Sequence, residues 1–169
     1  MREIPYIILL AACLILQAAF LDGMRVFGAA PDILFIVALY AALFAPKSHA
    51  TLAAVMAGLA SDVFAGGRLG VHALLFGLVA AFLVYAREKI FKEHPLSQAV
   101  LAFAALCVIE VAYALAAKIQ YPTASAGALL AAGILSALWT AALAPFALAL
   151  LVKFNRTMGF FQKRSLADV

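Results

Sequence analysis

Residues 51–84, TLAAVMAGLASDVFAGGRLGVHALLFGLVAAFLV, decide the fold. They form two apolar segments rich in small side chains, separated by a glycine-rich turn. Small residues recur every four positions in each segment, so they lie in one row along a helix. The two rows are Ala50, Ala54, Gly58 and Asp62, and Ala73, Gly77 and Ala81. Rows of small residues let helix backbones approach closely inside lipid, so the sequence predicts a tight helical hairpin.

Three glycines lie between the two segments, at Gly66, Gly67 and Gly70. Glycine tolerates positive φ and close backbone approach, as a sharp turn near a membrane surface requires. The GxxxG pattern of Gly66 and Gly70 is interpreted as part of this turn, because a dimerisation motif would lie within an apolar helix.

Asp62 lies near the end of the first segment, where an acid needs a partner. A carboxylate costs about 3 kcal/mol at the centre of a membrane helix and less near the interface. The expected partners are Arg68 and His72, or the free amides at the start of the next helix, where the helix dipole favours negative charge. Asp62 therefore either caps the hairpin or contacts a partner protein or ligand. His72 is interpreted as a hydrogen-bonded packing residue.

The composition of the whole chain indicates an integral membrane protein. Of 169 residues, 68% are hydrophobic and 12% are charged, whereas a soluble domain carries about 25% charged residues. The length suits one domain spanning 1–169. The formal net charge is +4, but the basic residues are scattered along predicted loops. They are interpreted as topology determinants and contacts with anionic lipid head groups at the cytoplasmic face, and nucleic-acid binding is excluded.

The sequence predicts an all-α fold of six transmembrane helices followed by a basic tail at 153–169. The predicted spans are 4–21, 33–45, 50–65, 70–86, 96–117 and 125–152. A crossing helix needs about 20 residues, so the second to fourth spans are short. They either stand upright in a thinned bilayer or include a re-entrant pair. Six crossings place most Lys and Arg on the side of both termini, which predicts cytoplasmic termini.

The remaining polar residues suggest little chemistry. Glu110 is isolated in the fifth span, where it faces either the bundle interior or a partner helix. Pro31 and Asp32 precede the second span as ordinary helix start signals. No nucleophile has an adjacent base, no residues show metal-ligand spacing, and no spacing requires Asp62, His72 and Glu110 to converge. The sequence therefore predicts no enzyme, no cofactor and no metal site.

An ordered series of motifs between Pro31 and about Leu83 resembles the rod-shape-determining MreD family. The series consists of Pro31-Asp32-Ile33-Leu34 with Tyr40, then Pro46-Lys47, then Gly58-Leu59-Ala60-Ser61-Asp62, then Gly66-Gly67-Arg68-Leu69-Gly70, and finally His72. Length, span number and topology agree with this resemblance.

The resemblance implies a non-enzymatic protein of the bacterial cytoplasmic (inner) membrane. Such a protein acts with the bitopic protein MreC to connect MreB filaments to the RodA glycosyltransferase and a penicillin-binding transpeptidase. The family is also similar to the six-helix substrate-binding components of energy-coupling-factor vitamin transporters. The alternative function is therefore a small-molecule binding subunit in which Asp62 and Glu110 line a pocket.

Overall fold

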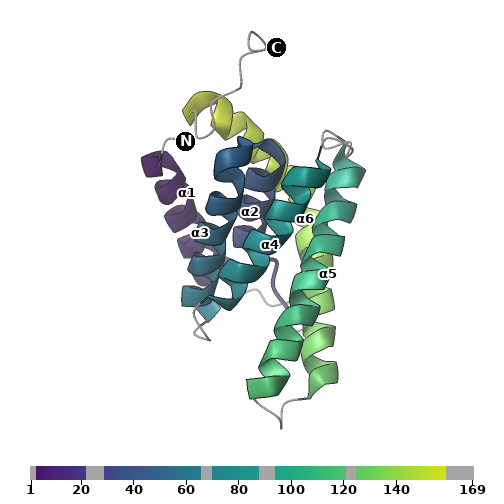
Figure 1. The fold of residues 1–169 in the computed structure, drawn as a ribbon. Helices are drawn as coiled ribbons and strands as arrows, with labels where there is room; N and C mark the ends of the chain where they lie inside the picture. Colours follow the sequence, from purple (N-terminus) through teal and green to yellow (C-terminus); the bar gives the residue numbers. More distant parts are fainter. Residues whose placement is uncertain (1–2, 22–28, 66–69, 88–93, 121–124, 159–169) are drawn as a thin grey trace.

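The computed structural model describes residues 3–21, 29–65, 70–87, 94–120 and 125–158. These residues form six α-helices and one π-helical segment, and no strand is present among them (Figure 1). The elements are α1 (Glu3–Leu16), η1 (Gln17–Leu21), α2 (Ile33–Phe44), α3 (Lys47–Ala65), α4 (Val71–Ala86), α5 (Pro95–Gln120) and α6 (Ala126–Met158). The predicted all-α class is confirmed for this part of the chain.

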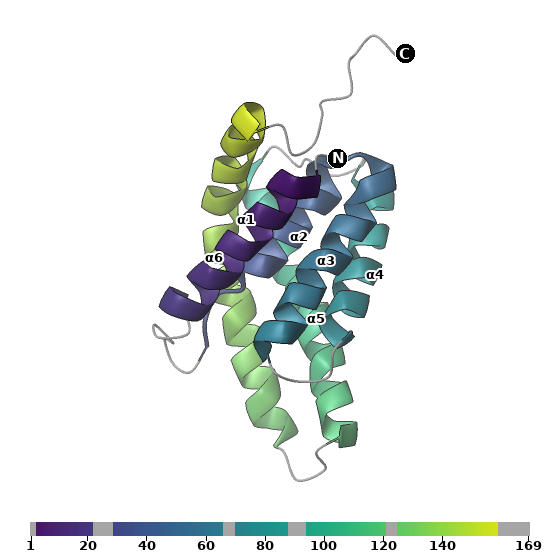
Figure 2. The same ribbon diagram turned by 90° about the vertical axis from the view of Figure 1, so that its left-hand side faces the viewer.

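Helix α2 lies at the centre of the bundle, packed among α1, α3, α4 and α6 (Figures 1 and 2). Every residue from Leu34 to Leu43 is buried, as is typical of a helix that is apolar on all sides. At the end of α2 the Arg87 guanidinium donates to the carbonyl oxygens of Ala42 and Ala45 at 3.2 and 2.6 Å. These bonds satisfy carbonyl groups that a helix end leaves without partners.

Helices α3 and α4 form the tight hairpin that the small-residue rows predict. A Cβ atom on Gly58 would lie 2.5 Å from the Cα of Ala73, and one on Gly77 would lie 2.7 Å from a valine side chain of α3. The row on α4 differs at its end, because Ala81 is exposed and Ala80 is buried instead. An α-helix has 3.6 residues per turn, so a strict four-residue step drifts off the contact face.

Gly70 is the N-cap residue that precedes α4, with φ of 103°, in the left-handed region that glycine adopts without steric cost. The predicted turn residues Gly66 and Gly67 lie outside the described residues, as does Arg68.

Helices α5 and α6 form a second hairpin, which extends beyond the end of the α3–α4 hairpin in both views (Figures 1 and 2). Helix α6 continues to Met158, so the first part of the predicted tail 153–169 is helical, and the predicted end of the membrane span at residue 152 stays a prediction. The helix also contains Pro145, which membrane helices tolerate because neighbouring groups satisfy the freed backbone.

Two helices, α5 and α6, are long and apolar enough to cross a membrane, over Pro95–Lys118 and Gly127–Asn155, and only 28% and 33% of their most apolar windows are buried. Shorter apolar stretches are Tyr6–Ala19, Ile33–Phe44 and Val71–Ala86. Large apolar side chains such as Leu78, Val108 and Phe146 lie exposed on the outer helix faces. An apolar exterior of this extent is typical of a surface in contact with lipid. Crossings beyond α5 and α6 stay a prediction.

Candidate functional site

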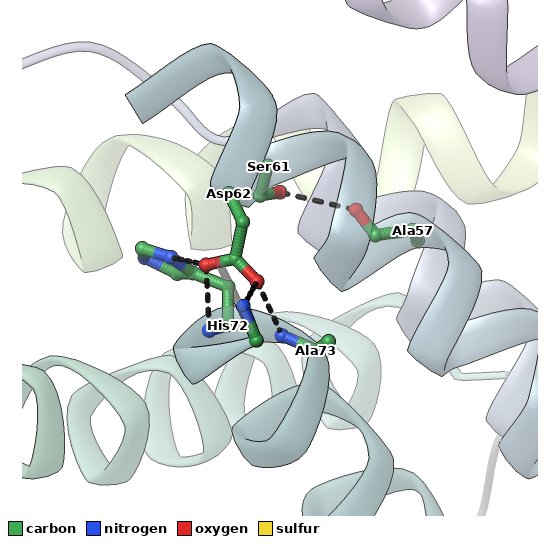
Figure 3. A network of polar contacts seen from close by, with 6 residues as sticks. Ala57, Ser61, Asp62, His72 and Ala73 are labelled. Atoms are coloured by element: carbon green, nitrogen blue, oxygen red, sulfur yellow. Dashed lines mark hydrogen bonds and ion pairs between the residues drawn. The ribbon is translucent and has the colours of Figure 1, made fainter. Parts of the chain in front are cut away.

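Asp62 receives four hydrogen bonds where α4 begins (Figure 3). Its Oδ2 accepts the backbone N–H groups of Gly70 at 2.8 Å and Ala73 at 3.2 Å. Its Oδ1 accepts the backbone N–H of His72 at 2.9 Å and contacts the Nδ1 of the same residue at 2.9 Å. The amides of a first helical turn have no intrahelical partner, and the helix dipole favours a carboxylate there. These are the hairpin-capping contacts that the sequence predicts.

The position of the His72 ring follows from the bond to Asp62. An ionised carboxylate can only accept a hydrogen bond, so the His72 nitrogen bonded to it, Nδ1, is the one that carries a proton. The imidazole stacks on Tyr113 of α5 with centroids 4.7 Å apart and meets Phe76 edge-on at 6.0 Å. His72 therefore packs against α5 while bonding to α3.

A second set of polar contacts surrounds the start of α2. Asp32 is the N-cap, and its Oδ1 accepts the backbone N–H of Phe35 at 2.9 Å. Gln17 Oε1 accepts the amides of the first two helical residues at 3.0 and 3.2 Å. The predicted helix start at Asp32 is confirmed, but Pro31 precedes the cap and does not lie in the first turn.

The backbone leading into α2 is held by hydroxyl groups of α6. Thr140 Oγ1 accepts the Asp32 N–H at 2.9 Å and donates to the Ser136 carbonyl at 2.8 Å. Ser136 Oγ donates to the Ala30 carbonyl at 2.9 Å. Non-helical backbone at membrane depth is tolerated where such partners satisfy it. Sequence reasoning missed Gln17, Ser136 and Thr140; the available signal was their isolation within apolar segments.

Glu110 lies between α5 and α6, facing the start of α4. A Cβ atom on Gly133 of α6 would lie 2.8 Å from the Glu110 Oε2 and 2.9 Å from its Cβ. Glu110 interacts electrostatically with Asp32 and His72. The side chain therefore faces the bundle interior, one of the two orientations that the sequence left open.

Tertiary packing thus brings together polar residues from distant parts of the chain. No spacing in the sequence required Asp62, His72 and Glu110 to converge. In the fold Asp62 and His72 are in direct contact, and Glu110 lies on α5 three residues before Tyr113, on which His72 stacks. We call the set Gln17, Asp32, Asp62, His72, Glu110, Ser136 and Thr140 the polar centre. It collects where α2 and α4 begin, because both helix starts expose amides that need acceptors.

Most side chains of the polar centre form hydrogen bonds to other groups of the protein. Among the described residues, no group of three His, Cys, Asp or Glu side chains is arranged to hold a metal ion. In the same part of the chain, no fully buried side-chain nitrogen or oxygen lacks a hydrogen-bond partner. Four contacts engage both oxygens of Asp62. The arrangement favours a structural role for this acid over ligand binding.

Replacing Thr140 with Val should destabilise the start of α2. The valine keeps the shape of the side chain but leaves the partly buried Asp32 N–H without its acceptor, which costs about 2 kcal/mol. In detergent, the melting temperature should fall by roughly 4 to 8 °C. Thr51→Val on α3 is the control, since the Thr51 side chain is only partly buried and makes no hydrogen bond to another described residue. Equal melting of the two variants would contradict the role of Thr140.

The family model described as rod shape-determining protein MreD matches residues 3–154. No curated protein and no solved structure matches the chain.

Proposed function

The chain belongs to the MreD family of rod shape-determining proteins, and from this membership we propose that it is a non-enzymatic scaffold or regulator of the bacterial elongation complex. In this role it binds MreC and links MreB to RodA and a penicillin-binding transpeptidase. The observation that carries the proposal is the family match over residues 3–154. Maintenance of rod shape is the role that the family name states.

The structure supports a scaffold through the placement of its polar and apolar groups. The polar centre is turned inward and bonded to helix starts, whereas the outer faces of α4, α5 and α6 carry large apolar side chains. Inside a membrane, such faces are available to other helices and to lipid. We propose that MreC packs on one of them.

The proposed topology has six crossings with both termini in the cytoplasm. Lys47 begins α3, Arg87 follows α4, and Lys153 lies near the end of α6. These three ends of the helices lie at the same end of the bundle (Figure 1). Lys118 lies near the end of α5, at the opposite end of the bundle. More of the described basic residues lie at the first of these ends. This distribution supports placing that end in the cytoplasm, in contact with anionic lipid head groups.

The alternative function, a vitamin-binding subunit, requires both Asp62 and Glu110 to line a pocket. Asp62 is engaged by the start of α4. The scaffold is therefore the function that the geometry supports better.

Depletion of the protein in its native bacterium tests the proposal. Cells should swell and round over several generations, and fluorescent labelling should show loss of side-wall peptidoglycan insertion. Added vitamins should not restore shape. Normal rods, or a growth defect cured by a vitamin, would contradict the scaffold and favour the transport-type subunit.

A further inference from the structure

The two hairpins end at different levels along the bundle axis, at the end of the bundle where α4 begins (Figures 1 and 2). The contact between the rings of His72 and Tyr113, with centroids 4.7 Å apart, places the start of α4 level with Tyr113. Asp62 bonds to this same start, so α3 ends within one turn of that level. Helix α5 continues over residues 114–120. The α5–α6 hairpin therefore projects about 5 to 10 Å beyond the α3–α4 hairpin, at 1.5 Å per residue.

Both hairpin ends require water or lipid head groups nearby. Non-helical backbone cannot find hydrogen-bond partners in hydrocarbon, so the ends of membrane helices lie at the interface. The carboxylate of Asp62 and the left-handed Gly70 mark the end of the α3–α4 hairpin. Lys118, which is exposed, lies near the end of α5, and a charged side chain is costly inside the bilayer. A flat membrane surface cannot meet both ends.

The outer faces of both hairpins are apolar almost to their ends. Val63 of α3 and Leu74 of α4 are 66% and 63% exposed, and Leu115 on the projecting part of α5 is 64% exposed. Side chains of this kind are solvated by lipid chains. Helix α4 has 16 residues and is about 24 Å long, which is shorter than a bilayer core of about 30 Å. Helix α5 has 26 residues and is about 39 Å long.

We propose that the protein thins the lipid bilayer on one side only. Beside the α3–α4 hairpin, the membrane surface lies nearer the bilayer centre than it does beside the α5–α6 hairpin. We call this difference in level the step. A short apolar helix is accommodated by thinning of the adjacent bilayer, so phospholipids with short or disordered chains surround α3 and α4. The step requires that both hairpins cross the membrane, as in the proposed topology, and it is independent of the role in cell shape.

Spin labels on the full chain in dioleoylphosphatidylcholine vesicles test the step. One label at a time is attached to Val63→Cys, Val111→Cys or Leu115→Cys, in a chain whose two cysteines are replaced by alanine. Val111 and Leu115 are exposed on α5, two residues before and after Tyr113, so they bracket the level of Val63. With the step, the Val63 label should be about twofold or more as accessible to a water-soluble nickel reagent as either α5 label. A value between those of the two α5 labels would indicate a flat surface and overturn the proposal.

Labels at the other end of the bundle distinguish the step from tilt of the whole protein. Tyr85 of α4 follows His72 by as many residues as Val100 of α5 precedes Tyr113, so the two lie at similar levels, and both are exposed. Tilt that brings the start of α4 to the membrane surface draws Tyr85 deeper into the lipid than Val100. The step leaves the Tyr85 label at least as accessible to the nickel reagent as the Val100 label. Lower accessibility at Tyr85 would contradict the step.

The unmodified chain provides a second measurement that needs no substitution. Its thermal unfolding is followed in vesicles of monounsaturated phosphatidylcholines with chains of about 14 to about 22 carbons. Thick bilayers oppose thinning beside α3 and α4. The melting temperature should therefore be highest in the shorter-chain lipids and fall by about 3 °C or more in the longest. A melting temperature that rises throughout the series would show that α5 and α6 alone set the membrane thickness, and the proposal would fail.

Discussion

Replacing Asp62 with Ala should melt the protein at a markedly lower temperature. The change removes the acceptor for three amides at the start of α4 and for the His72 Nδ1. Hydrogen bonds to charged groups contribute about 1.5 to 3 kcal/mol each, and the abandoned donors keep their desolvation cost. A total loss of about 3 kcal/mol, or roughly 6 to 12 °C in detergent, is a conservative expectation.

Ser61→Ala is the matched control for Asp62→Ala. Ser61 is also buried, one position away on α3, but its hydroxyl group only donates to the carbonyl of Ala57 on its own helix at 3.3 Å (Figure 3). Its removal should cost less than about 1 kcal/mol. Unchanged melting of the Asp62 variant would refute the hairpin cap.

Gly58→Leu should prevent normal packing of the α3–α4 hairpin. Even the Cβ atom would lie 2.5 Å from both the Cα of Ala73 and the carbonyl oxygen of His72. Both are backbone atoms, so no side-chain rotation relieves the overlap, and the hairpin must separate. Overpacking costs about 1 to 3 kcal/mol where side chains can adjust, and more is expected here. We expect aggregated or poorly recovered protein in size-exclusion chromatography and, under the proposed function, loss of co-purification with the proposed partner MreC.

Gly127→Leu provides the control for the glycine substitution. Gly127 lies near the start of α6, it is exposed, and the nearest atom to a new Cβ is a serine oxygen at 4.0 Å. The same side chain should be tolerated there and should improve helix propensity slightly. Normal recovery and an unchanged elution profile of Gly58→Leu would count against the close approach of the two helices.

The sequence predicted those parts of the fold that depend on local pattern. Runs of apolar residues fixed the helical class, because in lipid the backbone must satisfy its own hydrogen bonds. The four-residue spacing through Gly58 predicted the α3–α4 contact, and an acid before a glycine turn predicted the Asp62 cap. Both inferences concern neighbours in sequence, joined by one short turn.

Only the tertiary structure brought Glu110, Asp32 and His72 together, and only it placed Gln17 and Thr140 at the start of α2. These residues come from different helices, and one-dimensional spacing contains no information about which faces of distant helices meet. The short central α2 begins inside the bundle, so its free amides require acceptors from whichever helices surround it. The sequence by itself therefore determined an apolar helical protein with one capped hairpin. Packing around α2 decided which isolated polar side chains form the polar centre. Buried backbone N–H groups without an intrahelical partner need hydrogen-bond acceptors close by.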